Sequence, residues 1–208
     1  MCIRDSTDTR QKKLHRALVR LAQPSRRWVS LDFFSDAEIN VLVDFARAQQ
    51  FRRAQSEIVH RANRVFQDFD VCFPAPRLGV FDDLAAGLES GLFAAGSELA
   101  QNPFASHFRF DDFAIQRYPA GSRGIGIHRD GKRYKHIVLI ITLAGQSRLF
   151  STTSRAGEMR QRIDDRLGRL VLLSADGFAG RHDEDARPLH GVDCVRTGRL
   201  SIGFRSFG

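Results

Sequence analysis

The stretch "GIGIHRDGKRYKHIVLIITLAG", residues 124–145, places two histidines and an aspartate directly before a long apolar run. The apolar residues that follow His136 predict a buried strand. His128 and Asp130 are two residues apart, a spacing that on a strand directs both side chains to one face. The many basic residues around them leave two interpretations open: a solvated, charged loop, or part of a metal site.

Short apolar runs separated by clusters of Gly, Asp and Ser flank this stretch. Such runs are typical of strands bounded by turns. The predicted strands are residues 113–118, 136–143, 147–152, 168–174, 189–195 and 199–205. Many short strands in succession predict an antiparallel sandwich or jelly roll.

The first half of the chain is predicted to be helical. Apolar residues recur at helical spacing in residues 8–22, 35–50 and 80–100, and Ser35 and Glu38 have the spacing of a capping box. Helices followed by strands make the fold class α+β. We therefore expect a double-stranded β-helix (jelly roll) core with N-terminal helices packed on the outside.

We expect a single domain overall, in which residues 7–104 form the helical part packed on the core and residues 105–208 form the jelly-roll core. The first six residues, "MCIRDS", resemble the translation of a sequencing adapter. We expect residues 1–6 to be a non-native scar, and we leave them out of the fold prediction.

The composition is that of a basic globular protein. The 208 residues carry a net charge of +8, and residues 1–64 alone hold 13 Lys and Arg against 7 Asp and Glu. Such an excess attracts nucleic acids and other polyanions without a designed site. Three widely spaced cysteines argue against a disulfide framework. No apolar run approaches the roughly 20 residues of a membrane span. We predict a cytoplasmic protein without a membrane contact; the oligomeric state stays open.

The final predicted strand, "RLSIGFR" at residues 199–205, alternates between two faces. Arg199, Ser201 and Arg205 share one face, and the apolar residues share the other. Buried arginines are costly unless an anion meets them, and Arg suits a carboxylate because it offers two parallel hydrogen bonds. This face is therefore a candidate anion site.

A two-residue turn at Thr197 and Gly198 would pair the strand of residues 189–195 with the final strand. His190 would then pair with Arg205 and face the same space. Together with His128 and Asp130 this gives two imidazoles and one carboxylate, the ligand set of non-haem Fe(II) oxygenases. With neutral histidines such a site has a formal charge of about +1, which favours an anionic chelator.

These residues resemble the Fe(II)/2-oxoglutarate-dependent dioxygenase superfamily, whose pattern is His-X-Asp, a distant His, and an Arg about ten residues later on the last jelly-roll strand. Here they are His128-Arg129-Asp130, His190 and Arg199. The ending from Arg199 to Arg205 is most similar to the AlkB-like branch. The resemblance covers about residues 113–206, and the helical half matches no motif.

The resemblance implies the cofactors and the roles of the site residues. His128, Asp130 and His190 would bind Fe(II), with 2-oxoglutarate as co-substrate, O₂ as oxidant, and ascorbate as an aid to turnover. Arg199 would bind the distal carboxylate of 2-oxoglutarate, and Arg205 would lie near its chelating end. The residues that would assist are Ser201, Gln116 and Tyr118.

The expected reaction hydroxylates or oxidatively demethylates a C–H bond and releases succinate and CO₂. The substrate is expected to be an anionic small molecule, a protein or a nucleic acid, because five basic residues surround the site: Arg123, Arg129, Lys132, Arg133 and Lys135. Nucleobase-demethylating relatives often place an acidic residue after the metal Asp, where this chain has Gly131 and Lys132. The alternatives are an AlkB-like nucleic-acid dealkylation enzyme, or a non-catalytic jelly-roll module that binds polyanions.

Overall fold

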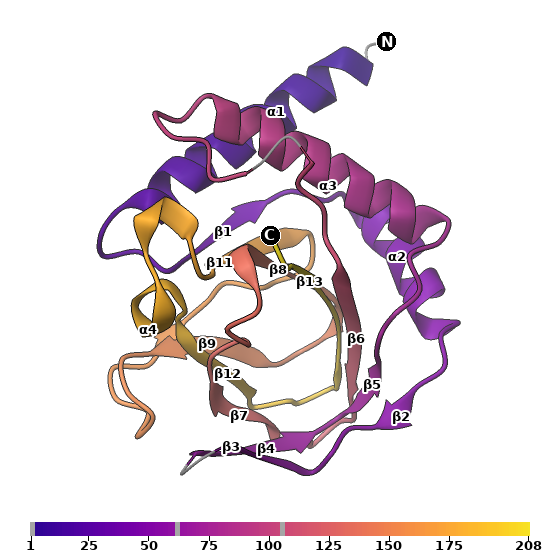
Figure 1. Ribbon diagram of the computed structural model, residues 1–208. Helices are drawn as coiled ribbons and strands as arrows, with labels where there is room; N and C mark the ends of the chain where they lie inside the picture. Colours follow the sequence, from indigo (N-terminus) through magenta and orange to yellow (C-terminus); the bar gives the residue numbers. More distant parts are fainter. Residues whose placement is uncertain (1–2, 61–62, 105–106) are drawn as a thin grey trace.

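The computed structural model describes residues 3–60, 63–104 and 107–208, and within them two antiparallel sheets face each other as a barrel (Figure 1). The larger sheet has seven strands, in the order β1 (Trp28–Asp32), β11 (Arg169–Ser174), β8 (Lys135–Gly145), β13 (Arg199–Ser206), β6 (Asp112–Tyr118), β5 (Asp70–Cys72) and β2 (Arg52–Arg53). The smaller has six, in the order β10 (Gln161–Arg162), β9 (Arg148–Thr152), β12 (Leu189–Asp193), β7 (Gly124–His128), β4 (Asn63–Asp68) and β3 (Glu57–His60).

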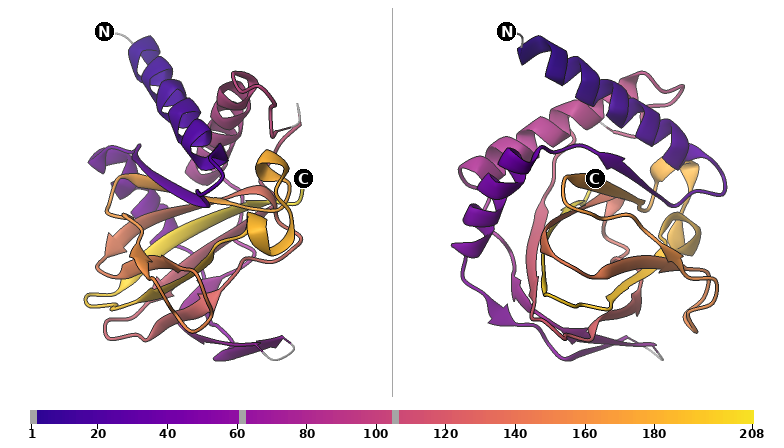
Figure 2. Two further views of the ribbon diagram at one scale, coloured as in Figure 1. Left: turned by 90° about the vertical axis from the view of Figure 1, so that its left-hand side faces the viewer. Right: turned by 180° about the vertical axis from the view of Figure 1, so that it is seen from behind.

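Three long helices lie outside the barrel, over the larger sheet (Figures 1 and 2). They are α1 (Ile3–Ala22), α2 (Asp36–Arg47) and α3 (Val80–Ser97); a 3₁₀ turn η1 (Phe178–Gly180) and a short helix α4 (Asp183–Ala186) precede β12. The predicted α+β jelly roll with external helices is thus confirmed. No helix in the described residues is long and apolar enough to cross a membrane.

The helices are held by an apolar layer on the outer face of the larger sheet. Phe204 of β13 is fully buried there, and its ring centroid lies 5.4 Å from that of Phe81 in α3 and 5.3 Å from that of Phe113 in β6. Burial of such rings is a large source of folding free energy. At the start of α2, Ser35 and Glu38 form the predicted capping box.

The inner faces of the two sheets enclose a second apolar cluster. Val138 and Val171 of the larger sheet pack there with Ile125, Leu149 and Val192 of the smaller sheet. Apolar side chains thus fill part of the barrel, and the polar residues described below occupy the rest of its interior.

Five strands lie in a region for which the sequence indicated only helices. Strands β1 to β5 fall within residues 28–72, and they join both sheets. Strand β2 exposes both of its residues and β4 buries none, so these strands lack the apolar alternation that marks a strand in sequence.

The predicted hairpin between the last two strands is wrong. Strand β12 pairs with β7 and β9, whereas β13 pairs with β6 and β8 in the other sheet. The connection contains Cys194 and Gly198 in the left-handed region, at φ 49° and 85°. The chain there crosses from one sheet to the other, so His190 and Arg205 face one interior from opposite walls.

Candidate metal centre

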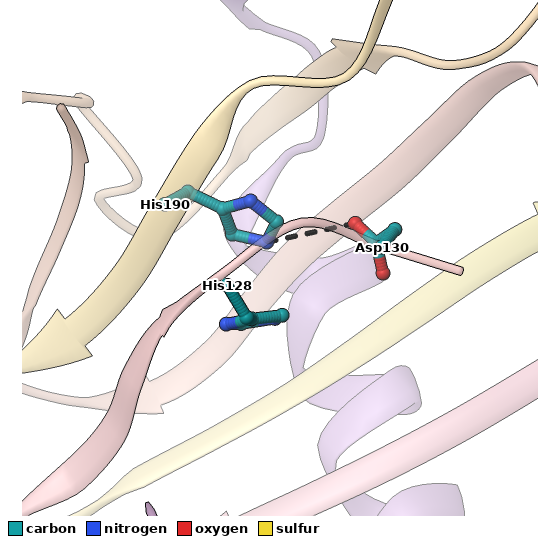
Figure 3. Close-up of side chains that lie close together, drawn as sticks. All are labelled: His128, Asp130 and His190. Carbon is teal, nitrogen blue, oxygen red and sulfur yellow. Dashed lines mark ion pairs between the residues drawn. The ribbon is translucent and has the colours of Figure 1, made fainter. Parts of the chain in front are cut away.

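Three side chains at one place in the barrel interior converge on a common point (Figure 3). His128 ends β7, Asp130 follows two residues later, and His190 lies on β12 opposite His128 in the ladder. One ligand atom from each of the three lies within 4.8 Å of the others. Nε2 of His190 lies 3.5 Å from Oδ2 of Asp130. This is a set of donor atoms that could hold one metal ion.

Both histidines are held in the same tautomer by the backbone. Nδ1 of His128 lies 2.8 Å from the carbonyl oxygen of Gly126, and Nδ1 of His190 lies 3.1 Å from that of Pro188. A carbonyl oxygen only accepts, so each Nδ1 carries the proton and donates it. Each Nε2 is then left with a free lone pair, the form in which imidazole binds metals.

The protonation states suit metal binding. Burial, with a contribution from His190, lowers the pKa of His128 to about 4. For Asp130, burial opposes ionisation, but Arg205 and the two histidines together hold its pKa below the ordinary value. At neutral pH, His128 is therefore a neutral ligand and Asp130 a carboxylate.

Arg205 lies beside the carboxylate and is itself held in place. Its Nε donates to Oδ1 of Asp130 at 3.2 Å, and its guanidinium lies 5.3 Å from the ring centroid of Tyr134. The Tyr134 hydroxyl in turn donates to Asp112 at 2.6 Å. Arg187 donates to the backbone carbonyl of Asp130 at 2.7 Å. These contacts orient the carboxylate before any metal arrives.

Arg199 lies farther along β13, with its side chain 1% exposed. Its Nη1 donates to Oγ of Ser147 at 2.9 Å and to the carboxylate of Asp165. Its Nε is buried and has no hydrogen-bond partner in the described chain. A buried donor without a partner is unusual, and it marks a place where a further acceptor would fit.

The remaining predicted residues lie on the same inner face. In the ladder between β13 and β6, Ser201 is opposite Gln116, and Arg199 is opposite Tyr118. The Tyr118 hydroxyl donates to Oε1 of Gln116 at 3.2 Å. The structure thus brings the metal-ligand candidates together with Arg205, and places the other four along the interior wall of the larger sheet.

Sequence reasoning missed several residues that shape this site. Asp112, Tyr134 and Arg187 support Asp130 and Arg205, and Asp165 pairs with Arg199. Asp112, Tyr134 and Arg187 are polar residues just before predicted strands, but that position alone does not indicate a role. The contact between Asp165 and Arg199 joins residues 34 positions apart, and no sequence pattern indicates it.

The chain was compared with protein families, curated proteins and solved structures to find proteins of the same fold. No protein-family model matches the chain, and no curated protein sequence does. Solved structures do match. A prolyl hydroxylase from Trichoplax adhaerens, in complex with a hypoxia-inducible-factor peptide fragment, is 13% identical with a TM-score of 0.66, over 96% of this chain and 91% of that one. A 2OG-Fe(II) oxygenase-family oxidoreductase from Burkholderia pseudomallei is 14% identical with a TM-score of 0.59, over 94% and 90%.

The chain therefore has the fold of the Fe(II)/2-oxoglutarate-dependent oxygenases. An AlkB homologue is also similar: OsALKBH1 is 13% identical with a TM-score of 0.57, over 86% of this chain and 97% of that one. Further prolyl hydroxylases resemble the chain as well. The fold likeness thus extends to the AlkB-like proteins without being specific to them.

Proposed function

We propose that this protein is an Fe(II)- and 2-oxoglutarate-dependent dioxygenase. The observation that carries the proposal is the convergence, inside a barrel of this fold, of His128, Asp130 and His190 with their ligand atoms within 4.8 Å. The reaction would hydroxylate or oxidatively demethylate a C–H bond of the substrate, with release of succinate and CO₂.

The residues present fit the metal and the co-substrate. Two neutral imidazoles and one carboxylate suit Fe(II) and leave coordination positions open for a chelating co-substrate and O₂. The unpartnered Nε of Arg199 offers a donor for the distal carboxylate of 2-oxoglutarate. Along the interior wall, Ser201 and Gln116 lie between Arg199 and Arg205, and Tyr118 lies opposite Arg199.

In the mechanism, the chain's own residues bind, orient and shield. Iron bound by His128, Asp130 and His190, with its co-substrate and O₂, would supply the oxidising power for cleavage of the C–H bond, and ascorbate would keep the iron reduced. His128 and His190 present Nε2 because the backbone holds their Nδ1 protons. Arg205 fixes the Asp130 carboxylate. The apolar interior walls exclude water and limit side reactions.

The substrate is proposed at the level of its class. Four of the basic residues near the site already pair with acids: Arg129 with Glu184, Lys132 with Asp183, Arg133 with Asp112, and Lys135 with Asp176. Such pairing weakens their attraction for phosphates. A protein side chain or a small anion is therefore favoured over nucleic acid. Failure of every methylated oligonucleotide to stimulate turnover would remove the AlkB-like alternative.

The proposal is tested with purified protein, Fe(II), ascorbate, O₂ and 2-oxoglutarate, by measuring succinate. We expect slow succinate release from the wild type and almost none from His128→Ala, which lacks a metal ligand. His182→Ala is the matched control, because His182 is exposed and lies outside the cluster. Wild-type protein that forms no succinate, with Fe(II) binding unchanged in His128→Ala, would favour the non-catalytic binding module instead.

A further inference from the structure

The carboxylate of Asp165 is already hydrogen-bonded to the guanidinium group of Arg199. The Asp165 carboxylate accepts from Nη1 of Arg199 and, at 3.0 Å, from the hydroxyl of Thr142. Both Asp165 and Arg199 are buried, at 6% and 3% exposure. The guanidinium charge is thus balanced inside the barrel before any ligand arrives.

This balance has a consequence for an incoming carboxylate. Arg199 is the only cation that the structure records in contact with Asp165 among the described residues. A dicarboxylate whose far end reaches the open Nε side of Arg199 would place two negative groups on one positive group. Their repulsion is screened only weakly in a buried site. A ligand whose far end is uncharged would not be repelled by Asp165 in this way.

Other basic side chains lie around Asp165 and could pair with its carboxylate in place of Arg199. Asp165 lines a pocket of about 450 Å³ whose wall also contains Arg162, Arg166 and Arg196. Arg162 and Arg196 form no ion pair within the described part of the chain. A carboxylate displaced from Arg199 would therefore meet other cations.

We propose that Asp165 competes with the distal carboxylate of 2-oxoglutarate for Arg199, and so makes the site respond only to a high concentration of this co-substrate. This inference rests on the proposed function. It identifies Asp165 as a residue that sets co-substrate affinity through Arg199, without touching the metal.

The test is equilibrium binding of 2-oxoglutarate by calorimetry, with Mn(II) in place of Fe(II) so that no turnover occurs. Asp165→Asn keeps the size and one hydrogen-bond acceptor but removes the charge. We expect it to bind 2-oxoglutarate about tenfold more tightly than the wild type. Binding of 2-oxobutanoate, which has the same chelating end but no distal carboxylate, should be unchanged.

Two further variants serve as controls for the effect of Asp165→Asn. Ser147→Ala removes the other partner of Nη1 without a change of charge, and it should not tighten binding. Thr142→Val removes the hydroxyl that holds Asp165, and it should tighten binding a few-fold, which keeps the test valid if Asp165→Asn fails to fold.

The outcomes separate this inference from the function. Wild-type protein that binds 2-oxoglutarate, together with variants that bind it no more tightly, overturns only the role of Asp165. Equal tightening for 2-oxobutanoate also overturns it, since the effect would not depend on the distal carboxylate. Absence of binding in every protein, with Mn(II) present, overturns both proposals.

Discussion

His128 and His190 owe their roles to the backbone two residues earlier. In each case the carbonyl of residue i−2 accepts from Nδ1 and fixes its proton, and Nε2 of His190 lies 3.5 Å from Asp130. The orientation is therefore built into the strands and does not depend on a bound metal. Burial, and not this hydrogen bond, keeps His128 neutral, because burial lowers its pKa whereas the contact with Gly126 raises it.

The pKa of His128 predicts how the metal-free protein responds to acid. Its pKa is about 4 when folded and about 6.5 when unfolded. Between about pH 4 and about pH 6.5 the unfolded chain therefore binds a proton at His128 that the folded chain does not bind. The free energy of unfolding keeps its full value above about pH 6.5 and falls as the pH drops toward 4. The loss amounts to at most about 3 kcal/mol.

Denaturant unfolding in the presence of a chelator, at about pH 7.5 and about pH 5, measures this loss. In His128→Asn the amide can replace the Nδ1 donor but does not titrate, so this variant should lose less stability between the two pH values. Identical pH dependence in the two proteins would show that His128 is not neutral by burial.

Much of the site could be predicted from residue spacing. Strand alternation predicts that His128 and Asp130 share a face and that Arg199 and Arg205 share a face, but it does not show that His190 faces the arginines from the opposite sheet. The hydrogen bonds that hold Asp130 and Arg199 in place could not be predicted. The contacts of Asp165 with Arg199, and of Arg187 with Asp130, cross between loops and strands whose distance in space depends on the whole fold.

At the scale of elements, the pairing of β7 with β12 assembles the site. It sets His128 opposite His190, with a register shift between His190 and Val192. Gly124, at the start of β7, has φ +86°, and a Cβ there would overlap the carbonyl oxygen of Val192. The close approach of the two strands thus requires glycine at this position.

Gly124→Ala is therefore expected to destabilise the protein by about 2–4 kcal/mol, and to weaken metal binding because the two histidines move apart. The matched control is Gly87→Ala in α3, where a Cβ meets nothing within 4 Å. That change should stabilise the protein by about 0.5–1 kcal/mol. Thermal unfolding and metal titration of both variants provide the check, and a stable Gly124→Ala with normal metal affinity would contradict this account.

For the whole molecule, the sequence predicted the layers better than the connections. Long amphipathic segments such as 35–50 and apolar runs such as 136–143 carry their own signal, so the outer helices and most strands of the second half were predicted, but β7 and β10 were not. Strands β1 to β5 and the crossing between β12 and β13 were not. Alternation tells which face a residue occupies, but it does not tell which strand lies beside it.

The candidate ligands come from β7, the residues just after it, and β12 in the smaller sheet, and Arg205 of β13 in the larger sheet orients Asp130, so the complete site needs both sheets. Diffraction from crystals grown anaerobically with Fe(II), with an anomalous difference map at the iron edge, locates the metal. The account predicts one strong peak bonded to Nε2 of His128, Nε2 of His190 and the carboxylate of Asp130. A map without a peak at these three groups, from protein saturated with Fe(II), would contradict it.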